Sequence, residues 1–186
     1  MSKDNTRCVC PTELAGSLDS RLRQWLHNPE TILAPYIRKG MTVLDQGCGP
    51  GFFIVQMAHL VGDFGRVIAS DLQPYMLERA RQKVKDTELE KRILFHQCQP
   101  DRIGLTEQAD FILLFYVVHE SPDKVALFKE LATILKPDGQ ILMAEPPIHV
   151  SKSQFQASID IALKNGFNSF QGPKIFLTKT AILKRV

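Results

Sequence analysis

From Met41 to the C-terminus, short apolar runs alternate with segments that have the pattern of helices. The runs are apolar almost throughout, which is typical of parallel strands covered by helices on both faces. We therefore expect an α/β fold with right-handed crossovers. The expected strands are 42–45, 67–71, 93–97, 110–115, 140–145, 169–177 and 180–184, and the expected helices are 52–61, 74–84, 124–135 and 151–165.

Two turns and a helix cap refine this pattern. Only a turn at 178–179 separates the last two expected strands, so they should be antiparallel, because a parallel pair needs a long crossover. The sequence KPDG at 136–139 is expected to form the turn that ends a helix. Ahead of the alternating region, 18–27 and 30–37 read as helices, with Asn28 as a cap and Pro29 in a first turn.

The 186 residues suit one domain, which we divide into an N-terminal tail and helical lid (1–38) and a core (39–186). A formal net charge of +3 without a dense run of Lys and Arg gives no sign of a nucleic-acid partner. No apolar stretch reaches the roughly 18 residues of a membrane span, and no signal peptide is expected. We therefore expect no membrane partner. Four cysteines in a poor disulfide pattern indicate a reducing compartment, so we expect a cytoplasmic protein.

A glycine-rich turn, DQGCGPG at 45–51, joins the first expected core strand to the helix that follows. Ligands bind at this edge of an open parallel sheet, and glycines let the backbone come close to them. The turn is not a P-loop, because Gly-Lys-Ser/Thr is missing, and Phe52 replaces the third glycine of a dinucleotide motif. Asp45 would repel a pyrophosphate, whereas it suits a ligand that carries an ammonium and a sulfonium.

Asp71 ends the second expected strand, beside that turn. A carboxylate at this place accepts hydrogen bonds from ribose hydroxyls in dinucleotide folds, and we expect the same role here. The alternative is that Asp71 caps the next helix. We expect Asp45 and Asp71 to meet across adjacent strand tips.

With these residues the chain resembles the class I S-adenosylmethionine-dependent methyltransferases. Residues 45–51 resemble motif I of that family, and the acid at 71 and the turn at 136–139 stand where the family has them. The resemblance covers about 40–186 and includes the ubiquinone/menaquinone methyltransferase subgroup. It implies a three-layer α/β/α sandwich with a seven-stranded, mostly parallel sheet of order 3-2-1-4-5-7-6 and an antiparallel last strand. It also implies S-adenosylmethionine as the methyl donor and S-adenosylhomocysteine as the product.

Turn and resemblance together indicate one set of cofactor-binding residues. The resemblance places Leu72 and Met76 beside the adenine, although core packing is an alternative for Met76. Gln99 stands where many relatives have an acid that binds the adenine amino group, and its amide oxygen can accept the same bond. Cys98 is expected to offer its backbone N–H. The full set is Asp45, Gly47, Cys48, Gly49, Gly51, Asp71, Leu72, Met76, Cys98, Gln99 and Phe115, with Phe115 beside the methionine part and the thiols of Cys48 and Cys98 read as buried and inert.

Catalysis of methyl transfer mainly requires alignment, and a base only when the acceptor must lose a proton. His119 resembles a histidine that is common at this place in the family and has the pKa of a base. The alternative is that His119 orders its loop or caps the next helix. Weaker candidates are Tyr116, Glu120, Glu145 and His149.

The N-terminal region leaves several alternatives open. Cys8 and Cys10 suit a soft metal, but zinc spacing is absent, and the alternative is a tail with unemployed thiols. We therefore expect no metal. The chain has no long insertion for an acceptor lid, so the acceptor pocket must come from 1–38, come from a partner subunit, or be open. The apolar side chains at Trp25, Leu26, Ile32 and Leu33 either face a small apolar acceptor or pack on the sheet edge.

The expected function is methyl transfer to an unidentified acceptor, of which a small molecule is the favoured kind, with a homodimer as a further option. The shortness of the chain keeps a second function open, that of a non-catalytic Rossmann-like module that holds the cofactor or a partner. A nicotinamide-dependent oxidoreductase is a third function, against which the missing glycine argues.

Overall fold

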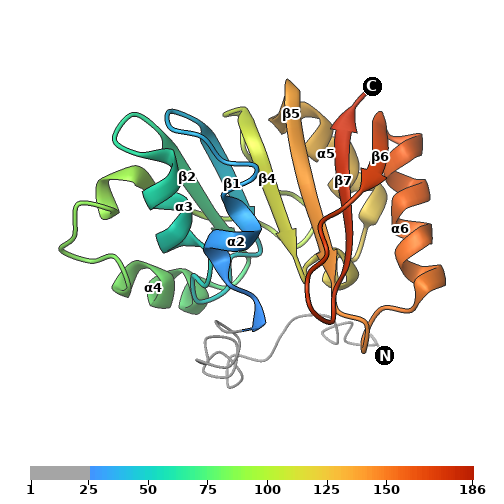
Figure 1. Ribbon diagram of the computed structural model, residues 1–186, viewed down its shortest axis with the longest axis horizontal. Coiled ribbons are helices and arrows are strands. Elements are labelled where there is room, and N and C mark those ends of the chain that lie inside the picture. Colours follow the sequence, from blue (N-terminus) through green and yellow to red (C-terminus); the bar gives the residue numbers. More distant parts are fainter. Residues whose placement is uncertain (1–25) are drawn as a thin grey trace, which may run out of the picture.

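The computed structural model describes residues 26–186, which form one sheet with helices on both faces (Figure 1). The strands are β1 (Thr42–Gln46), β2 (Arg66–Asp71), β3 (Ile93–Gln97), β4 (Ala109–Phe115), β5 (Leu135–Glu145), β6 (Phe167–Gln171) and β7 (Lys179–Arg185). The α-helices are α2 (Pro29–Leu33), α3 (Ile54–Val61), α4 (Pro74–Gln82), α5 (Lys124–Ile134) and α6 (Lys152–Lys164), and the 3-10 helices are η2 (Glu90–Arg92) and η3 (Val118–Glu120).

The seven strands run in the order β3-β2-β1-β4-β5-β7-β6, which confirms the order that the resemblance implies. The pairs β1·β2, β1·β4, β2·β3 and β4·β5 are parallel, whereas β7 is antiparallel to both β5 and β6. The register sets Asp45 beside Ala69 and Gln46 beside Ser70. The ends of β1, β2 and β4 therefore meet at one edge of the sheet, which is where the glycine-rich turn lies.

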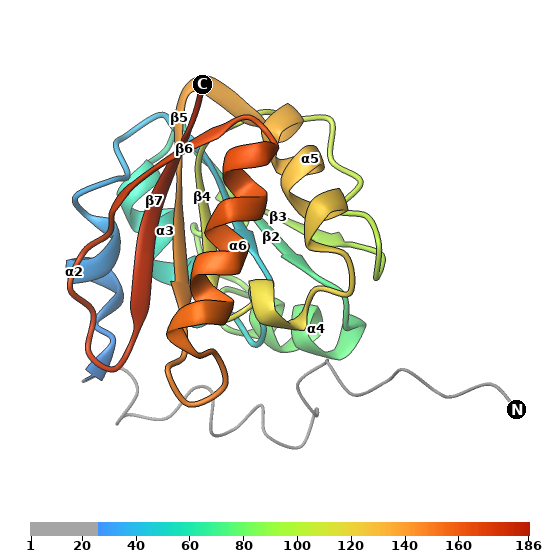
Figure 2. The ribbon, with the colours of Figure 1, turned by 90° about the vertical axis from the view of Figure 1, so that its right-hand side faces the viewer.

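Alternate residues of the central strands supply the two halves of the core. Val43 and Phe111 belong to the half that packs under α2, α3 and α4, and Leu44 and Ile112 belong to the half under α5 and α6. Figure 2 shows α2 and α3 on one side of the sheet and α5 and α6 on the other. Burying each such side chain stabilises the fold by about 1.5–3 kcal/mol, so the central strands fix the frame on which the site is built.

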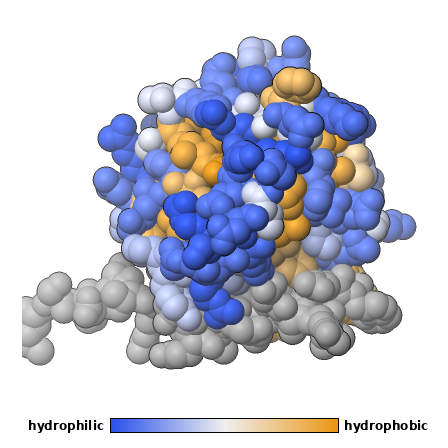
Figure 3. Space-filling view, turned by 90° about the vertical axis from the view of Figure 1, so that its left-hand side faces the viewer, coloured by the Kyte–Doolittle hydropathy of each residue, from blue (hydrophilic) through white to orange (hydrophobic). Residues whose placement is uncertain are grey.

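The sheet edge at β3 turns toward solvent. It is largely hydrophilic, with apolar side chains showing in limited patches (Figure 3). The guanidinium carbon of Arg81 on α4 lies 4.4 Å from the centre of the Phe95 ring on β3. Such a cation–π contact covers an aromatic ring at an exposed edge.

The N-terminal end of the described chain follows the predicted capping. Asn28 accepts a hydrogen bond from the backbone N–H of Thr31, and Pro29 begins α2. The helix ends at Leu33, earlier than the predicted 37, because Pro35 cannot continue a helical hydrogen-bond ladder. The predicted helix at 18–27 falls almost wholly outside the described residues.

Several predicted boundaries in the core also differ from the structure. Helix α3 begins at Ile54 rather than 52, since the turn of the glycine loop continues to Phe53, and α4 ends at Gln82 rather than 84. The sequence KPDG does not separate helix from strand, because it lies within β5 as an irregularity: Leu135 pairs with Ala109, and the next pair joins Gln140 to Phe111.

The last two strands form the predicted antiparallel pair, but β6 is shorter than predicted. It covers 167–171 instead of 169–177, and a connection at 172–178 leads to β7. Pro173 has no N–H with which to extend the ladder. Its carbonyl instead accepts a hydrogen bond from the Thr180 hydroxyl at 2.6 Å. This leaves 172–178 at the same sheet edge as the glycine-rich turn.

Candidate functional site

The glycine-rich turn leaves β1 and reaches α3 through three left-handed glycines. Gly47, Gly49 and Gly51 have φ values of 73°, 54° and 80°. A β-carbon at Gly47 would come within 2.5 Å of Cγ2 of Val117, and one at Gly51 within 2.7 Å of Cδ1 of Ile54. At Gly49 a β-carbon would meet no atom within 4 Å. The first and third glycines therefore serve packing, whereas the second presents backbone to open space.

The two carboxylates of the predicted site lie close to this turn. One carboxylate oxygen of Asp71 accepts a hydrogen bond from the N–H of Gly49 at 2.8 Å, and the other accepts from the N–H of Gln73 at 2.9 Å. Burial raises the pKa of Asp71, and hydrogen bonds from Gln73, Gly49 and Leu72 oppose the rise. Asp71 thus joins the glycine turn to the chain that precedes α4. The N-cap of α4 is Gln73, without a side-chain capping bond, so the alternative that Asp71 caps this helix is wrong.

The pKa of the Cys48 thiol indicates that Asp45 and Asp71 both lie near this side chain. Burial raises the pKa of the Cys48 thiol, and the charges of Asp45 and Asp71, followed by that of Cys98, raise it further. Asp45 is only 1% exposed. Both carboxylates therefore act on one thiol, as expected of residues that meet at the tips of β1 and β2. The raised pKa keeps the thiol protonated at neutral pH and agrees with an inert sulfur.

The residues predicted to hold the adenine lie around the ends of β2 and β3. Met76 is buried, Leu72 is half-buried and Gln99 is exposed. The N–H of Cys98 donates to the carbonyl oxygen of Asp71 at 3.1 Å. This amide is therefore engaged within the sheet edge, and the structure gives it a partner other than the predicted ring. Burial raises the pKa of the Cys98 thiol.

Gln46 is a candidate site residue that the sequence analysis did not find. Its side chain is buried between the glycine turn and β3, and its amide nitrogen donates to the sulfur of Cys98 at 3.6 Å. Its amide oxygen is buried without a hydrogen-bond partner among residues 26–186. A buried acceptor without a donor is costly, so a ligand N–H or a water is the expected partner. A glutamine before a glycine turn gives no sequence signal of this kind.

An aromatic cluster follows the end of β4. The Phe115 ring centre lies 4.8 Å from that of Phe53 and 5.5 Å from that of His27. Tyr116 has a φ of 65°, which is rare for a residue with a side chain. Its hydroxyl lies 2.9 Å from Oγ1 of Thr178 and 3.4 Å from Nε2 of His27. Three segments far apart in the sequence therefore meet here, and nothing in the local sequence predicts that meeting.

Beyond Tyr116, the chain forms η3, which carries His119. Nδ1 of His119 lies 2.6 Å from a carboxylate oxygen of Glu145 at the end of β5. The other oxygen of Glu145 accepts a hydrogen bond from the N–H of Val118 at 2.9 Å. Helix α5 is capped by Asp123, so the predicted alternative that His119 caps this helix is wrong. The other alternative, in which His119 orders its loop, agrees with the contact to Glu145.

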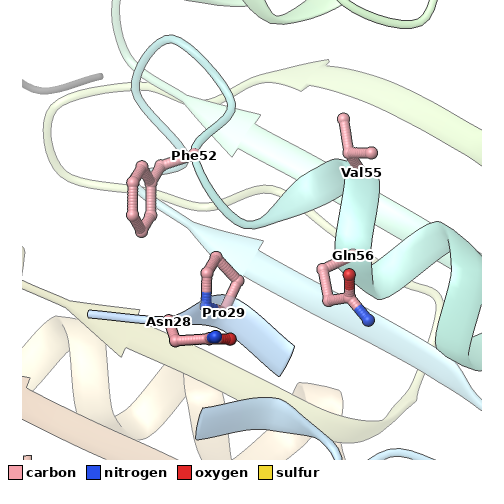
Figure 4. A pocket seen from close by; sticks show the side chains of 5 residues that line it. All are labelled: Asn28, Pro29, Phe52, Val55 and Gln56. Atoms are coloured by element: carbon pink, nitrogen blue, oxygen red, sulfur yellow. The ribbon is translucent and has the colours of Figure 1, made fainter. Parts of the chain in front are cut away.

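Of the four apolar residues proposed for a lid, two lie in the core, Leu26 is half-buried, and Trp25 is outside the described residues. Ile32 and Leu33 are buried in the half of the core under α3, so the alternative of packing on the sheet is confirmed for them. Near them a cavity of about 320 Å³ opens between the start of α2 and the start of α3 (Figure 4). Phe52 links this cavity to the glycine turn, and the cavity is lined by Asn28, Pro29, Phe52, Val55 and Gln56. Cys8, Cys10 and Trp25 lie outside the described residues.

Residues 26–186 contain neither a cluster of metal ligands nor a membrane-spanning helix. No three or more His, Cys, Asp and Glu side chains in it gather in a way that could hold a metal ion. No helix within it is both long enough and apolar enough to cross a membrane.

Comparison with known proteins gives a family match over residues 37–173, to the family described as a methyltransferase domain. The ubiquinone/menaquinone biosynthesis C-methyltransferase of Shewanella frigidimarina is 30% identical over 116 residues, which are 62% of this chain and 46% of that protein. The demethylmenaquinone methyltransferase of Lactococcus lactis is 31% identical over 63% of this chain and 48% of that protein. The chain thus spans about half the length of these curated relatives.

Solved structures share the fold over nearly the whole chain. A SAM-dependent methyltransferase from Aquifex aeolicus has a TM-score of 0.83 and 24% identity, and the match covers 94% of this chain and 98% of that one. A chain from the complex between the Haloferax volcanii Trm112 methyltransferase activator and a methyltransferase also matches. Its TM-score is 0.74 at 16% identity, and the match covers 94% of this chain and 96% of that one. These likenesses support the fold that the strand order shows.

Proposed function

The chain belongs to the family of methyltransferase domains, and on that premise we propose that it transfers a methyl group from S-adenosylmethionine to an acceptor. The observation that carries the proposal is the contact between the Asp71 carboxylate and the N–H of Gly49. It joins the acid at the tip of β2 to the turn after β1, at the edge where ligands of open parallel sheets bind. The sequence resemblance and the family agree on the donor.

The residues present fit such a donor. Open space at Gly49 lets the ligand approach the backbone, and Asp71 offers two carboxylate oxygens whose remaining lone pairs suit the ribose hydroxyls. Asp45 supplies buried negative charge for the ammonium group. Gln46 holds an unused acceptor oxygen beside the tip of β3. When bound, the donor supplies an electrophilic methyl group on a sulfonium, and the protein aligns it.

For the acceptor, we propose a small molecule. The curated relatives are named for methylation in ubiquinone and menaquinone biosynthesis, and we extend only the size class of such acceptors to this chain. The Tyr116, Thr178 and His27 cluster and the connection at 172–178 border the end of β4, and they are proposed as the wall of the acceptor site. A cytoplasmic location and a homodimer complete the proposal. The free, buried thiols of Cys48 and Cys98 agree with a reducing compartment.

Calorimetry with S-adenosylhomocysteine tests the donor site. Wild-type protein is expected to bind it at tens of micromolar or tighter, and Asp71→Ala should weaken binding at least several-fold. Asp138→Ala, an exposed acid within the irregularity of β5, is the matched control and should bind like wild type. Absence of binding by the wild type would contradict the proposal.

The same measurement separates the alternative functions. Binding of NADH without binding of S-adenosylhomocysteine would favour an oxidoreductase. Binding of the cofactor without turnover on a broad acceptor panel would favour a non-catalytic module.

A further inference from the structure

Glu145 is a buried acid, and each of its two carboxylate oxygens makes a hydrogen bond to the loop that follows β4. It is 1% exposed. One oxygen accepts the N–H of Val118 at 2.9 Å and the other lies 2.6 Å from Nδ1 of His119. A carboxylate cannot donate when ionised, so Nδ1 of a neutral His119 must carry the proton. The lone pair is then on Nε2, on the opposite side of the ring.

The imidazole belongs to the same sheet edge as the donor site. Val117, two residues before His119, packs directly over Gly47 of the glycine turn. The side chain of His119 is 24% exposed, and within residues 26–186 its only hydrogen bond is the one to Glu145. Nε2 is therefore turned away from Glu145 and free to meet a bound molecule.

The charged and titratable neighbours of His119 come from four places. Glu145 contributes from β5, Glu120 from η3 and Lys124 from α5. The ring of His149, in the loop after β5, is parallel within 4° with its centre 6.1 Å away. Burial by itself lowers the pKa of His119, but the hydrogen bond and charge of Glu145, assisted by Glu120, outweigh burial and Lys124, so the pKa is raised.

We propose that Glu145 is a positioning residue that holds His119 with Nε2 toward the acceptor as a general base, and that the acceptor is one that must lose a proton. Phenols, enols and carbon acids belong to this class, whereas tertiary amines do not. The inference rests on the proposed methyl transfer. In the step, an electron pair of the acceptor forms the bond to the methyl carbon, the carbon–sulfur bond breaks with its pair left on sulfur, and the acceptor proton passes to Nε2.

Glu145→Gln is the sharpest test of the positioning role, because it keeps the volume and one carbonyl oxygen of the side chain. That oxygen can serve either Val118 or His119, but not both, and the negative charge is gone. NMR of ¹⁵N-histidine-labelled protein, with His119→Gln to assign the signal, reads the tautomer and the pKa without turnover. We expect a wild-type His119 with its proton on Nδ1, and a lower pKa in Glu145→Gln. His149→Gln keeps the pair intact and should leave the His119 tautomer unchanged.

Methyl transfer to two matched probes tests the acceptor class. 1-Naphthol can lose a proton, whereas N,N-dimethyl-1-naphthylamine is a tertiary amine with none to lose. Transfer to 1-naphthol should fall at least 100-fold in His119→Gln, within the range expected for a lost general base. In Glu145→Gln it should fall at least about 10-fold, because the imidazole loses the carboxylate that holds its tautomer, and the midpoint of its pH profile should move to lower pH.

Three results would overturn the inference. They are a His119 proton on Nε2 in the wild type, an unchanged pKa in Glu145→Gln, or transfer to 1-naphthol that His119→Gln leaves undiminished. The NMR result decides the role of Glu145 whether or not a probe is methylated. Absence of S-adenosylhomocysteine binding by the wild type would instead contradict the proposed function. Failure of the inference and failure of the proposed function are therefore distinguishable.

Discussion

The side chain of Val117 lies so close over Gly47 that a β-carbon on the glycine would come within 2.5 Å of its Cγ2. This contact joins the loop after β4, which carries His119, to the turn after β1, which carries the proposed donor site. Substitution at Gly47 therefore tests whether the two halves of the site depend on each other.

Gly47→Ala is expected to destabilise the protein. The φ of 73° alone costs a residue with a side chain about 1–2 kcal/mol, and the clash adds about 1–3 kcal/mol. Denaturant unfolding measures the loss. The double variant with Val117→Ala should lose less stability than Gly47→Ala and Val117→Ala lose in sum, because the clash is relieved while the backbone strain stays. A double-variant loss equal to that sum would show that the contact is not the cause.

Gly49→Ala separates stability from ligand binding. At φ 54° with no atom within 4 Å, the substitution should cost only the backbone strain of about 1–2 kcal/mol. Its methyl group, however, would occupy the open space that we assign to the donor. Calorimetry should show a larger loss of S-adenosylhomocysteine affinity than unfolding shows of stability. Unchanged affinity would move the donor away from this turn.

Asp71 predicts a pH dependence of donor binding. Burial raises the pKa of Asp71 above that of an ordinary aspartate. Protonation removes part of its capacity to accept hydrogen bonds from ribose, so affinity should fall as the pH drops through the raised pKa. This fall should begin at a higher pH than an exposed aspartate would give. Calorimetry across mildly acidic pH checks it, and Asp71→Asn should bind weakly with no such pH dependence.

The pair of His119 and Glu145 predicts a pH dependence of stability. The pKa of His119 is raised in the folded protein, so its contribution is fully present below the unfolded value of about 6.5. That contribution is lost as the pH rises through the raised folded value. The difference in unfolding free energy between wild type and Glu145→Gln should therefore shrink from pH 5.5 to pH 9. A difference that grows with pH would contradict the assignment.

Tyr116 and Thr178 should be energetically coupled. Their side-chain oxygens are 2.9 Å apart, and such a bond contributes about 0.5–1.5 kcal/mol to stability. Tyr116→Phe and Thr178→Val should each lower the unfolding free energy, and the double variant should lose less than the sum of the two. Strict additivity would mean that the hydroxyls do not stabilise each other.

The donor half of the site was predictable because its parts follow from local patterns. Apolar strands fix where β1 and β2 end, and strand ends in a parallel sheet share one edge. Asp45, the glycines and Asp71 are therefore brought together by the fold that their own neighbours specify. The strand boundaries near the C-terminus were less predictable, because Gly172 and Pro173 end β6 through contacts with Thr180 on the neighbouring strand.

The acceptor half depends on partners that are distant in sequence. His119 and Glu145 were both visible as candidates, yet their 2.6 Å contact arises only because β4 and β5 are paired in register. The cluster of His27, Tyr116 and Thr178 likewise needs the N-terminal segment and the connection before β7 to reach the end of β4. Periodicity and turn chemistry act over a few residues, so the sequence by itself determined the α/β class of the fold and the donor turn. Which side chains meet above that turn was decided by tertiary packing, which fixes distances between segments that no local pattern relates.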